Sequence, residues 1–378
     1  MFFPLEMTVL FCRLHEAMNP NPKVLILCPY PLGISPSQRF RFEQYLDILR
    51  ERGIEFDVRP FLDIDTMRVV FKPGYMAKKV LGVISGFARR LLILPRVFTY
   101  DYIFIHREAA PLGPPLIEAI LFLMGRPVIF DFDDAIFISK TSKVNRFVGF
   151  AKWPSKIRFI TRHSLKVSVC NNYLVNWVKQ YNEHAVLLPT TIDLSYHKSV
   201  AKVQLATRRA VIGWTGTQST MGYLELVREA LKDLQDRYDF EFRVICDLDP
   251  KFPELKNYRF IKWALASEIE DLAGMDIGVM PVPQGEWEQG KVGFKAIQYA
   301  GVAAVPVVSS TGSGHEVVLH GKTGLVVDND KASWVTALSS LLDNPAKLGD
   351  MGQAAREYID MNYSVRSQVA TYLDLFGR

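Results

Sequence analysis

Two lysines, Lys291 and Lys295, lie four residues apart in the segment Gly290–Gly301, GKVGFKAIQYAG. The segment follows the apolar run DIGVMPV, which is typical of a buried strand, and its own pattern predicts a helix. Residues four apart share one face of a helix, so both ammonium groups can meet the same ligand. A helix N terminus adds amide donors and a favourable dipole for anions. The spacing therefore predicts a phosphate site, although a solvated helix face would look the same.

A second group of small residues lies at the end of another predicted strand, AVIGWTGT. It contains Gly213, Thr215, Gly216 and Thr217, which we expect to form a loop after the strand. Where side chains are small, the backbone can approach a phosphate closely. A structural turn would give the same pattern.

Other residues of the second half could contact a nucleotide sugar. Trp263 ends the predicted strand YRFIKW and could stack on a base, although such a tryptophan is more often part of a core. Gln298 offers an amide to hydroxyl groups. The loop that contains Gly312, Gly314 and His315 could contact the sugar, or could simply connect a strand to a helix.

Polar side chains also end two strands predicted in the first half, where open α/β sheets place their ligands. They are His106 and Arg107 after one strand, and Asp131, Asp133 and Asp134 after the next. We expect a role toward an acceptor or a sugar, with His106 and Asp131 as catalytic candidates and the other three on the acceptor side. Three carboxylates could also bind a divalent cation, act as a base or cap a helix. Linear spacing alone assembles no set of serine, histidine and acid.

Composition indicates a globular protein with two cores of ordinary size. The chain has 378 residues, 49% of them hydrophobic and 22% charged. No apolar run reaches the roughly 18 to 20 residues that a membrane span needs. We expect no secretory signal at the start, and we interpret residues 1–20 as an extension before the first strand. The four cysteines, Cys12, Cys28, Cys170 and Cys246, match no metal or redox spacing, so we expect reduced thiols in a cytosolic protein.

Positive charge is concentrated in the first half of the chain. Residues 1–200 carry 26 Lys or Arg against 17 Asp or Glu, and residues 201–378 carry 19 against 23. The segments Val69–Tyr100 and Ala135–Asn182 contain no acidic residue. Basic segments with interleaved apolar residues suit an anionic membrane surface, although a solvated basic face remains open. We expect Lys78, Lys79, Arg89 and Arg90 to contact lipid headgroups. No nucleic-acid motif accompanies the charge, so we expect no nucleic-acid partner.

Strand and helix patterns alternate through both halves, which predicts two α/β units joined near residues 193–209. We expect a first Rossmann-like domain at residues 21–195, a second at 205–360, and a helical tail at 361–378 that packs back on the first. The run SQRFRFEQYLDILRERG predicts one continuous helix that ends at Gly53.

The motifs GWTGT, DIGVMPV, GKVGFKAIQYAG, PVV, HEVV and GKTGLVV, in this order, resemble family 4 (group 1) of the nucleotide-sugar glycosyltransferases. HREAAPLGPP and VIFDFDDAIF add softer matches. The resemblance implies the GT-B fold of two facing Rossmann-like domains with a cleft between them. It also implies that the second domain binds the nucleotide diphosphate sugar, that the first binds the acceptor, and that transfer retains the anomeric configuration without a metal or other cofactor.

The chain departs from the family at three places. Two glutamates, eight positions apart in many members, are replaced by Gly290 and Gln298, and a basic pair is absent from GWTGTQST, where Lys291 and Lys295 look like its substitutes. Our main expectation is a retaining hexosyltransferase that acts on a glycan or lipid-linked acceptor in cell-surface polysaccharide or glycolipid synthesis, in the cytoplasm or peripherally at the inner membrane face. The alternatives are a nucleotide-sugar epimerase of the same fold and a degenerate transferase that serves as a scaffold.

Overall fold

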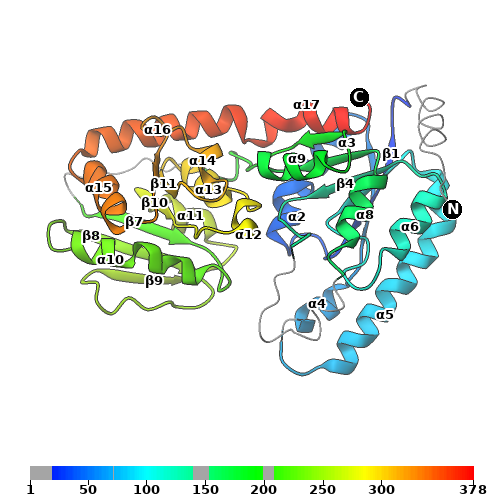
Figure 1. Ribbon diagram of the computed structural model, residues 1–378, viewed down its shortest axis with the longest axis horizontal. Helices are drawn as coiled ribbons and strands as arrows, with labels where there is room; N and C mark the ends of the chain where they lie inside the picture. Colours follow the sequence, from blue (N-terminus) through cyan, green and yellow to red (C-terminus); the bar gives the residue numbers. More distant parts are fainter. Residues whose placement is uncertain (1–18, 71, 139–152, 199–207) are drawn as a thin grey trace. The chain divides into compact units, whose positions relative to one another are not determined.

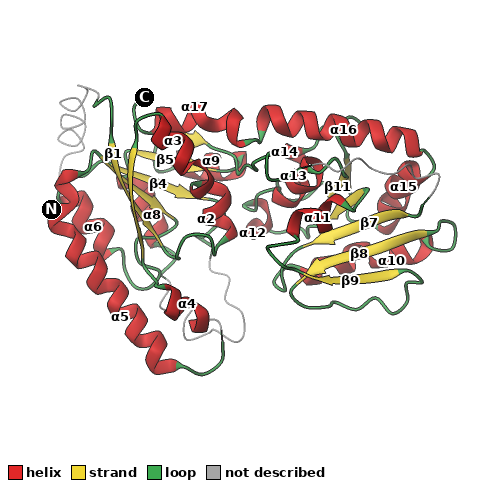
Figure 2. Ribbon diagram, turned by 180° about the vertical axis from the view of Figure 1, so that it is seen from behind, coloured by secondary structure: helices red, strands yellow, loops and turns green. Residues whose placement is uncertain are grey.

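The computed structural model describes residues 19–70, 72–138, 153–198 and 208–378, and Cys12 lies outside them. The chain divides into two compact units (Figures 1 and 2). One holds the described residues up to Pro189 together with Val369–Arg378, and the other is Thr190–Gln368. Each unit is built on a parallel sheet of six strands, which confirms the predicted α/β class.

The first sheet has the strand order β2-β1-β3-β4-β5-β6. Its strands are β1 (Lys23–Cys28), β2 (Glu55–Pro60), β3 (Tyr102–His106), β4 (Val128–Phe132), β5 (Lys166–Val169) and β6 (Ala185–Leu187). From β1 the chain first builds outward to β2 and then returns to add β3 on the other side of β1. The boundary between β1 and β3 is thus a topological switch point, where sheets of this kind bind ligands.

The helices of the first unit are α2 (Pro36–Arg41), α3 (Leu46–Glu51), α4 (Ile64–Val70), α5 (Met76–Ile93), α6 (Leu116–Leu123), α8 (Lys156–His163) and α9 (Asn172–Lys179), with 3-10 turns η1 (Glu43–Tyr45) and η2 (Leu94–Thr99). The continuous helix predicted from Ser37 to Gly53 is wrong, because η1 separates α2 from α3. Side chains bond to two carbonyls that a continuous helix would use for its own hydrogen bonds. The Gln44 side chain donates to the Phe40 carbonyl, and the Tyr372 hydroxyl donates to the Arg41 carbonyl.

The last ten residues pack on the first unit. Tyr372 of α17 (Val365–Leu375) lies 4.1 Å from Tyr45, centroid to centroid. Phe376 makes ring contacts with Phe56, Tyr102 and Phe104. These aromatic contacts explain why the end of the chain belongs with its beginning.

One of the four cations expected to face lipid points inward instead. Arg90 is fully buried and donates to the carbonyls of Ala109, Arg59 and Cys28, and burial lowers its pKa to about 10. Arg90 therefore holds α5 to the sheet and is not available to lipid headgroups. Arg89 is half-buried: it donates to the Phe61 carbonyl and pairs with an aspartate at 3.4 Å in the loop after β2.

The second sheet has the order β12-β11-β10-β7-β8-β9. Its strands are β7 (Ala210–Thr215), β8 (Phe240–Cys246), β9 (Tyr258–Lys262), β10 (Ile277–Met280), β11 (Val305–Ser309) and β12 (Leu325–Val327). The chain builds from β7 to β9 on one side, then crosses back to place β10 against β7. The switch point of this sheet lies between β7 and β10.

Helices cover both faces of this sheet (Figure 2). They are α10 (Glu225–Leu234), α11 (Glu268–Ala273), α12 (Glu286–Gln289), α13 (Phe294–Gly301), α14 (Gly314–Val317), α15 (Lys331–Leu342) and α16 (Pro345–Asn362), with the 3-10 turn η5 (Met221–Leu224). The core is a cluster of buried apolar side chains from the strands and from α10 and α15, with Trp214 and Trp334 the largest.

Cys28, Cys170 and Cys246 are buried and unpaired in disulfides, as the sequence predicts. Burial raises the pKa of the Cys28 thiol to about 12. Across the described residues, no helix is both long and apolar enough to span a bilayer.

Candidate active site

Strands β7 and β10 separate before they reach the carboxyl edge of the second sheet. Their residue pairing covers Ile212 with Ile277 and Gly213 with Gly278. Beyond it, the Tyr299 hydroxyl of α13 bridges the two strands: it accepts the Thr215 N–H at 3.0 Å and donates to the Val279 carbonyl at 3.2 Å. A Cβ at Gly278 would overlap the Tyr299 ring, so this glycine admits the bridge. The gap at the switch point is therefore held open by one side chain of α13.

The two lysines lie at this gap, each over an aromatic ring. The Lys295 ammonium, one helical turn before Tyr299, lies 5.7 Å from the centroid of Trp214 at the end of β7. The Lys291 ammonium lies 5.6 Å from the centroid of Tyr223, which follows the loop after β7. Both cations are thus directed toward the carboxyl end of the central strand.

The surroundings of Lys295 disfavour its positive charge. Burial, reinforced by the nearby cation of Lys291, lowers the pKa of Lys295 to about 8. Among the described residues, Lys295 forms no ion pair with a carboxylate. A partly buried cation with a cationic neighbour is stabilised by an anion, so the site is electrostatically prepared for a phosphate.

Lys295 lies in α13 but Lys291 lies in the turn before it, so the expectation that both share one helix face is wrong. The loop after β11 fixes this turn. Ser313 donates its hydroxyl to the Lys291 carbonyl. A Cβ at Gly293 would lie 3.1 Å from the Gly314 Cα, so the two backbones are in close contact. No side chain caps the N terminus of α13, which leaves that helix end to be satisfied by other groups.

Glycines predicted to contact the donor mostly serve packing. Gly213 lies inside β7, not in a loop, and a Cβ there would overlap Met275. Thr215 is the last residue of β7, so the loop of small residues begins only at Gly216. Gly312 has a φ of 73°, which favours glycine, and Gly314 packs against Val308.

The remaining donor candidates are not brought together. Gln298 is buried and donates to Glu268 at 3.3 Å, so its amide already has a carboxylate partner. Trp263 follows the edge strand β9, two strands from β7, and is partly exposed. His315 is exposed at the start of α14. Their contacts with a nucleotide sugar stay predictions.

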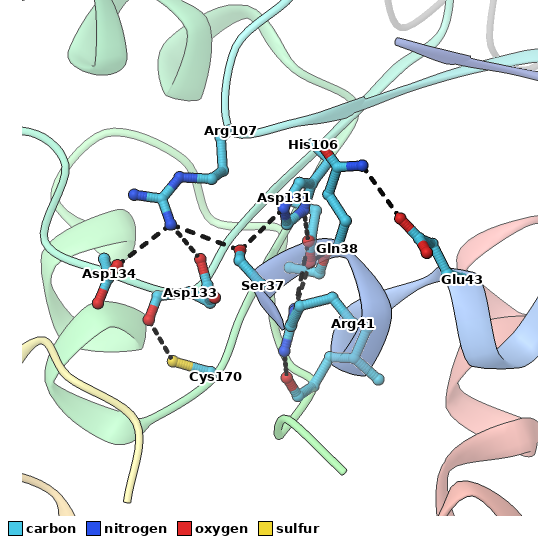
Figure 3. A network of polar contacts seen from close by, with 12 residues as sticks. Ser37, Gln38, Arg41, Glu43, His106, Arg107, Asp131, Asp133, Asp134 and Cys170 are labelled. Atoms are coloured by element: carbon cyan, nitrogen blue, oxygen red, sulfur yellow. Dashed lines mark hydrogen bonds and ion pairs between the residues drawn. The ribbon is translucent and has the colours of Figure 1, made fainter. Parts of the chain in front are cut away.

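The first unit assembles a set that linear spacing did not predict (Figure 3). His106, the last residue of β3, places Nδ1 2.8 Å from Asp131 and Nε2 3.0 Å from the Ser37 hydroxyl. Ser37 follows β1, so the set spans the β1/β3 switch point. In the neutral ring Nδ1 carries the proton toward the carboxylate, and Nε2 accepts from Ser37. This is the geometry of a serine, histidine and aspartate relay.

The carboxylate of Asp131 is paired with a positive charge on the side away from His106. Arg41 pairs with Asp131, both fully buried, and Ser168 donates its hydroxyl to the same carboxylate at 2.7 Å. Burial alone would raise the pKa of Asp131, but Arg41 and the hydrogen bond from His106 hold it well below its ordinary value. The relay thus orients His106 firmly, while Arg41 limits how much Asp131 can stabilise a protonated ring. The helical pattern around Arg41 gave no signal of this pairing.

Arg107 organises the other two aspartates. Its guanidinium lies 2.9 Å from Asp133 and 3.1 Å from Asp134, and 3.4 Å from the Ser37 hydroxyl. Burial would raise the pKa of Asp133, but Arg107, together with His106 and the Ser37 hydroxyl, lowers that pKa below its ordinary value. Among the described residues there is no cluster of three or more carboxylate, histidine or cysteine side chains that could hold a metal ion. Of the DFDD aspartates, Asp131 pairs with Arg41, whereas Asp133 and Asp134 pair with Arg107.

Comparisons with known proteins relate part of the second unit to glycosyltransferases. A family model described as "Glycosyl transferases group 1" matches residues 209–344. D-inositol 3-phosphate glycosyltransferase from Arthrobacter sp. (strain FB24) is 38% identical over 64 residues, which are 17% of this chain and 15% of that protein. The chain therefore aligns with only a small part of the length of this curated relative.

Solved structures match nearly the whole chain. A glycosyltransferase from Rickettsia africae has a TM-score of 0.68 at 12% identity, with 95% of this chain and 98% of that chain covered. Sucrose-phosphate synthase from Thermosynechococcus elongatus has a TM-score of 0.65 at 13% identity, with 94% and 98% covered. HepE from Anabaena, in complex with UDP and glucose, has a TM-score of 0.64 at 12% identity, with 94% and 100% covered. The chain thus has the GT-B fold, and its residues 209–344 match the family model of the group 1 glycosyltransferases.

Proposed function

We propose that the protein transfers a sugar from a nucleotide diphosphate sugar to a hydroxyl acceptor, with retention of the anomeric configuration. The observation that carries the proposal is the placement of Lys291 and Lys295 at the carboxyl end of β7, each over an aromatic ring. Two structurally similar proteins support a nucleoside diphosphate as the ligand: Anabaena HepE was solved with UDP, and the starch synthase IV domain of Arabidopsis thaliana was solved with ADP.

Two cations match what the chemistry requires. When the bond between the sugar C1 and the phosphate oxygen breaks, negative charge develops on the β-phosphate, and preorganised donors and cations stabilise it. The acceptor oxygen then bonds to C1 from the same face, and its proton passes to an oxygen of the departing phosphate. This route needs no separate base, and the lysines supply the positive charge that a metal ion would otherwise provide. We therefore propose metal-independent transfer.

The first unit would supply the acceptor side. Ser37, backed by His106, and the guanidinium of Arg107 present hydroxyl, imidazole and cationic groups at its own switch point. Such groups suit the hydroxyls of a sugar or glycan. We propose that they position the acceptor, in the cytoplasm at the inner membrane face, for synthesis of a cell-surface polysaccharide or glycolipid.

A donor panel tests this function. The full chain is incubated with several UDP-, GDP-, ADP- and TDP-sugars, with and without glycan and lipid-linked acceptors, and both the released nucleotide and the sugar products are measured. Transfer that depends on an acceptor and gives the retained anomer is expected. A changed donor sugar without any acceptor would establish the epimerase instead. Tight nucleotide binding with no product from any pair would favour the scaffold.

A further inference from the structure

The solvent face of α5 is apolar along its whole length. Of the ten exposed residues between Met76 and Ile93, only Lys78 and Ser85 are polar. Leu81, Ile84 and Leu92 are 64%, 58% and 77% exposed. The outward apolar residues, which we call the α5 face, are Met76, Ala77, Val80, Leu81, Ile84, Ala88, Leu91 and Leu92. A surface helix normally carries polar residues on this side, and among the described residues nothing covers the face, so it is suited to a partner.

The orientation of α5 is fixed by its inner side. A Cβ at Gly82 would overlap Thr66 of α4, and one at Gly86 would overlap Phe61, so these glycines let the helix lie close on the unit. Arg90 anchors the same side through three backbone carbonyls. The α5 face therefore cannot turn inward without breaking these contacts.

Cations and aromatic rings mark both ends of the α5 face. Lys72, Lys78 and Tyr75 are exposed at the start of the helix, and Arg96 and Phe98 are exposed just after its end. No acidic residue occurs from Val69 to Tyr100. An apolar stretch of about 27 Å between aromatic and basic ends matches the hydrocarbon boundary and the headgroups of an anionic leaflet.

The surface extends beyond α5 on one side. The Arg126 guanidinium, just after α6, lies 5.4 Å from the ring centroid of Phe98, just after α5, so the ends of the two helices lie close together. Leu116 and Leu123 of α6 are exposed as well. Two neighbouring helices thus present outward leucines, as expected for a surface that rests on a lipid layer.

We propose that the α5 face docks in the interfacial region of an anionic bilayer, with Lys72, Lys78 and Arg96 on the headgroups. A second copy of this chain is a poorer partner, because pairing two α5 helices would place cations against cations with no acid in the segment. A protein partner would need acids to match the ends and would find only the Ser85 hydroxyl as a polar side chain along the centre. The proposal deepens the membrane location given above and needs no assumption about the transfer reaction.

Two sets of variants of the full chain test the docking surface. Leu81→Gln, Ile84→Gln and Leu92→Gln together remove the apolar face while keeping good helix formers. Lys72→Gln, Lys78→Gln and Arg96→Gln together remove the exposed cations. The matched control is Met361→Gln with Leu248→Gln, two exposed apolar residues of the second unit. Sedimentation is measured with vesicles of phosphatidylcholine alone and of phosphatidylcholine with phosphatidylglycerol, at low and high salt, beside circular dichroism and molar mass in solution.

We expect the wild type and the control to bind anionic vesicles but not neutral ones. The three cation substitutions should lower the partition coefficient on the order of a hundredfold. The leucine and isoleucine substitutions should abolish the binding that survives high salt. Equal binding by the wild type and the folded α5 variants would overturn the proposal. So would a wild-type dimer that the apolar variants convert to monomer without any vesicle binding. Transfer to a water-soluble acceptor should be unchanged in all variants, which separates failure of this surface from failure of the proposed function.

Discussion

The ammonium group of Lys295 lies 5.7 Å from the centroid of the Trp214 ring, at the carboxyl end of the central strand of the second sheet. Lys295 comes from α13, which follows β10, and Trp214 comes from β7. The pair therefore joins the two strands at which the chain changes direction. An indole face partly compensates a half-buried cation without neutralising it, so the charge remains available to an anion.

The pKa of Lys295 predicts how donor use depends on pH. In the free enzyme this pKa is lowered to about 8, so the ammonium loses its proton as the pH rises through that value. We expect kcat/KM for the donor to fall above pH 8, whereas kcat should hold to higher pH because a bound diphosphate stabilises the ammonium. Lys295→Arg should remove the fall in kcat/KM. A wild-type profile that is flat to pH 9.5 would contradict this account.

Tyr299→Phe should destabilise the second unit. The substitution leaves the Thr215 N–H and one acceptor site of the Val279 carbonyl without the bridge, which costs about 1–3 kcal/mol of the free energy of unfolding. Chemical denaturation measures the change. Tyr238→Phe, which loses only an exposed hydrogen bond to Asp343, is the matched control and should change the free energy by less than about 0.5 kcal/mol. Equal effects of the two substitutions would show that the bridge has no special weight.

Asp131→Asn should cost about 3–5 kcal/mol, because it leaves the buried guanidinium of Arg41 without its counter-charge. The folded-state pKa of Asp131 is depressed, so its stabilising contribution is present above the unfolded pKa of about 3.9 and is lost as the pH falls below it. The variant should therefore show a shallower acid limb of stability than the wild type. Asp47→Asn, at an exposed pair with Arg50, should cost less than about 1 kcal/mol. Loss of stability that is the same for both variants would count against the buried relay.

Transfer should survive exhaustive chelation. The two lysines supply positive charge beside the diphosphate, and Arg41 and Arg107 already engage the DFDD aspartates. The measurement is the rate of product formation after dialysis against EDTA, with and without added Mg²⁺ or Mn²⁺. Strict dependence on a metal, restored in proportion to its occupancy, would refute metal-independent transfer.

Local pattern was sufficient for the strands and for the helix that carries Lys295, because buried parallel strands read as apolar runs. It was not sufficient for Lys291, which lies in the turn before α13 and not on a shared helix face, since glycines at 290 and 293 give no local sign of where the helix begins. Gly213 was wrongly assigned to a loop. In the sequence, a glycine that makes room for a packed side chain such as Met275 cannot be told from one that makes room for a ligand.

Contacts between distant residues could not be predicted in this way. The break after Arg41 depends on Tyr372, 331 positions later. The partners of Asp131 come from positions 25 to 90 residues away, namely His106, Ser168 and Arg41. Arg90 looked like a surface cation because a basic residue in an amphipathic pattern gives no sign that backbone carbonyls will enclose it. These contacts form because the order of strands in the sheet brings distant residues together, and a short stretch of sequence does not contain that order.

Turnover by lysine variants tests the central claim most directly. Lys291→Ala and Lys295→Ala are compared with the wild type and with Lys347→Ala, an exposed lysine of α16, in single-turnover transfer at saturating donor. If the two ammonium groups stabilise the departing diphosphate, each variant should lose roughly a hundredfold or more in rate while its circular dichroism is unchanged, and the control should lose nothing. A folded double variant that transfers sugar at the wild-type rate would contradict the account.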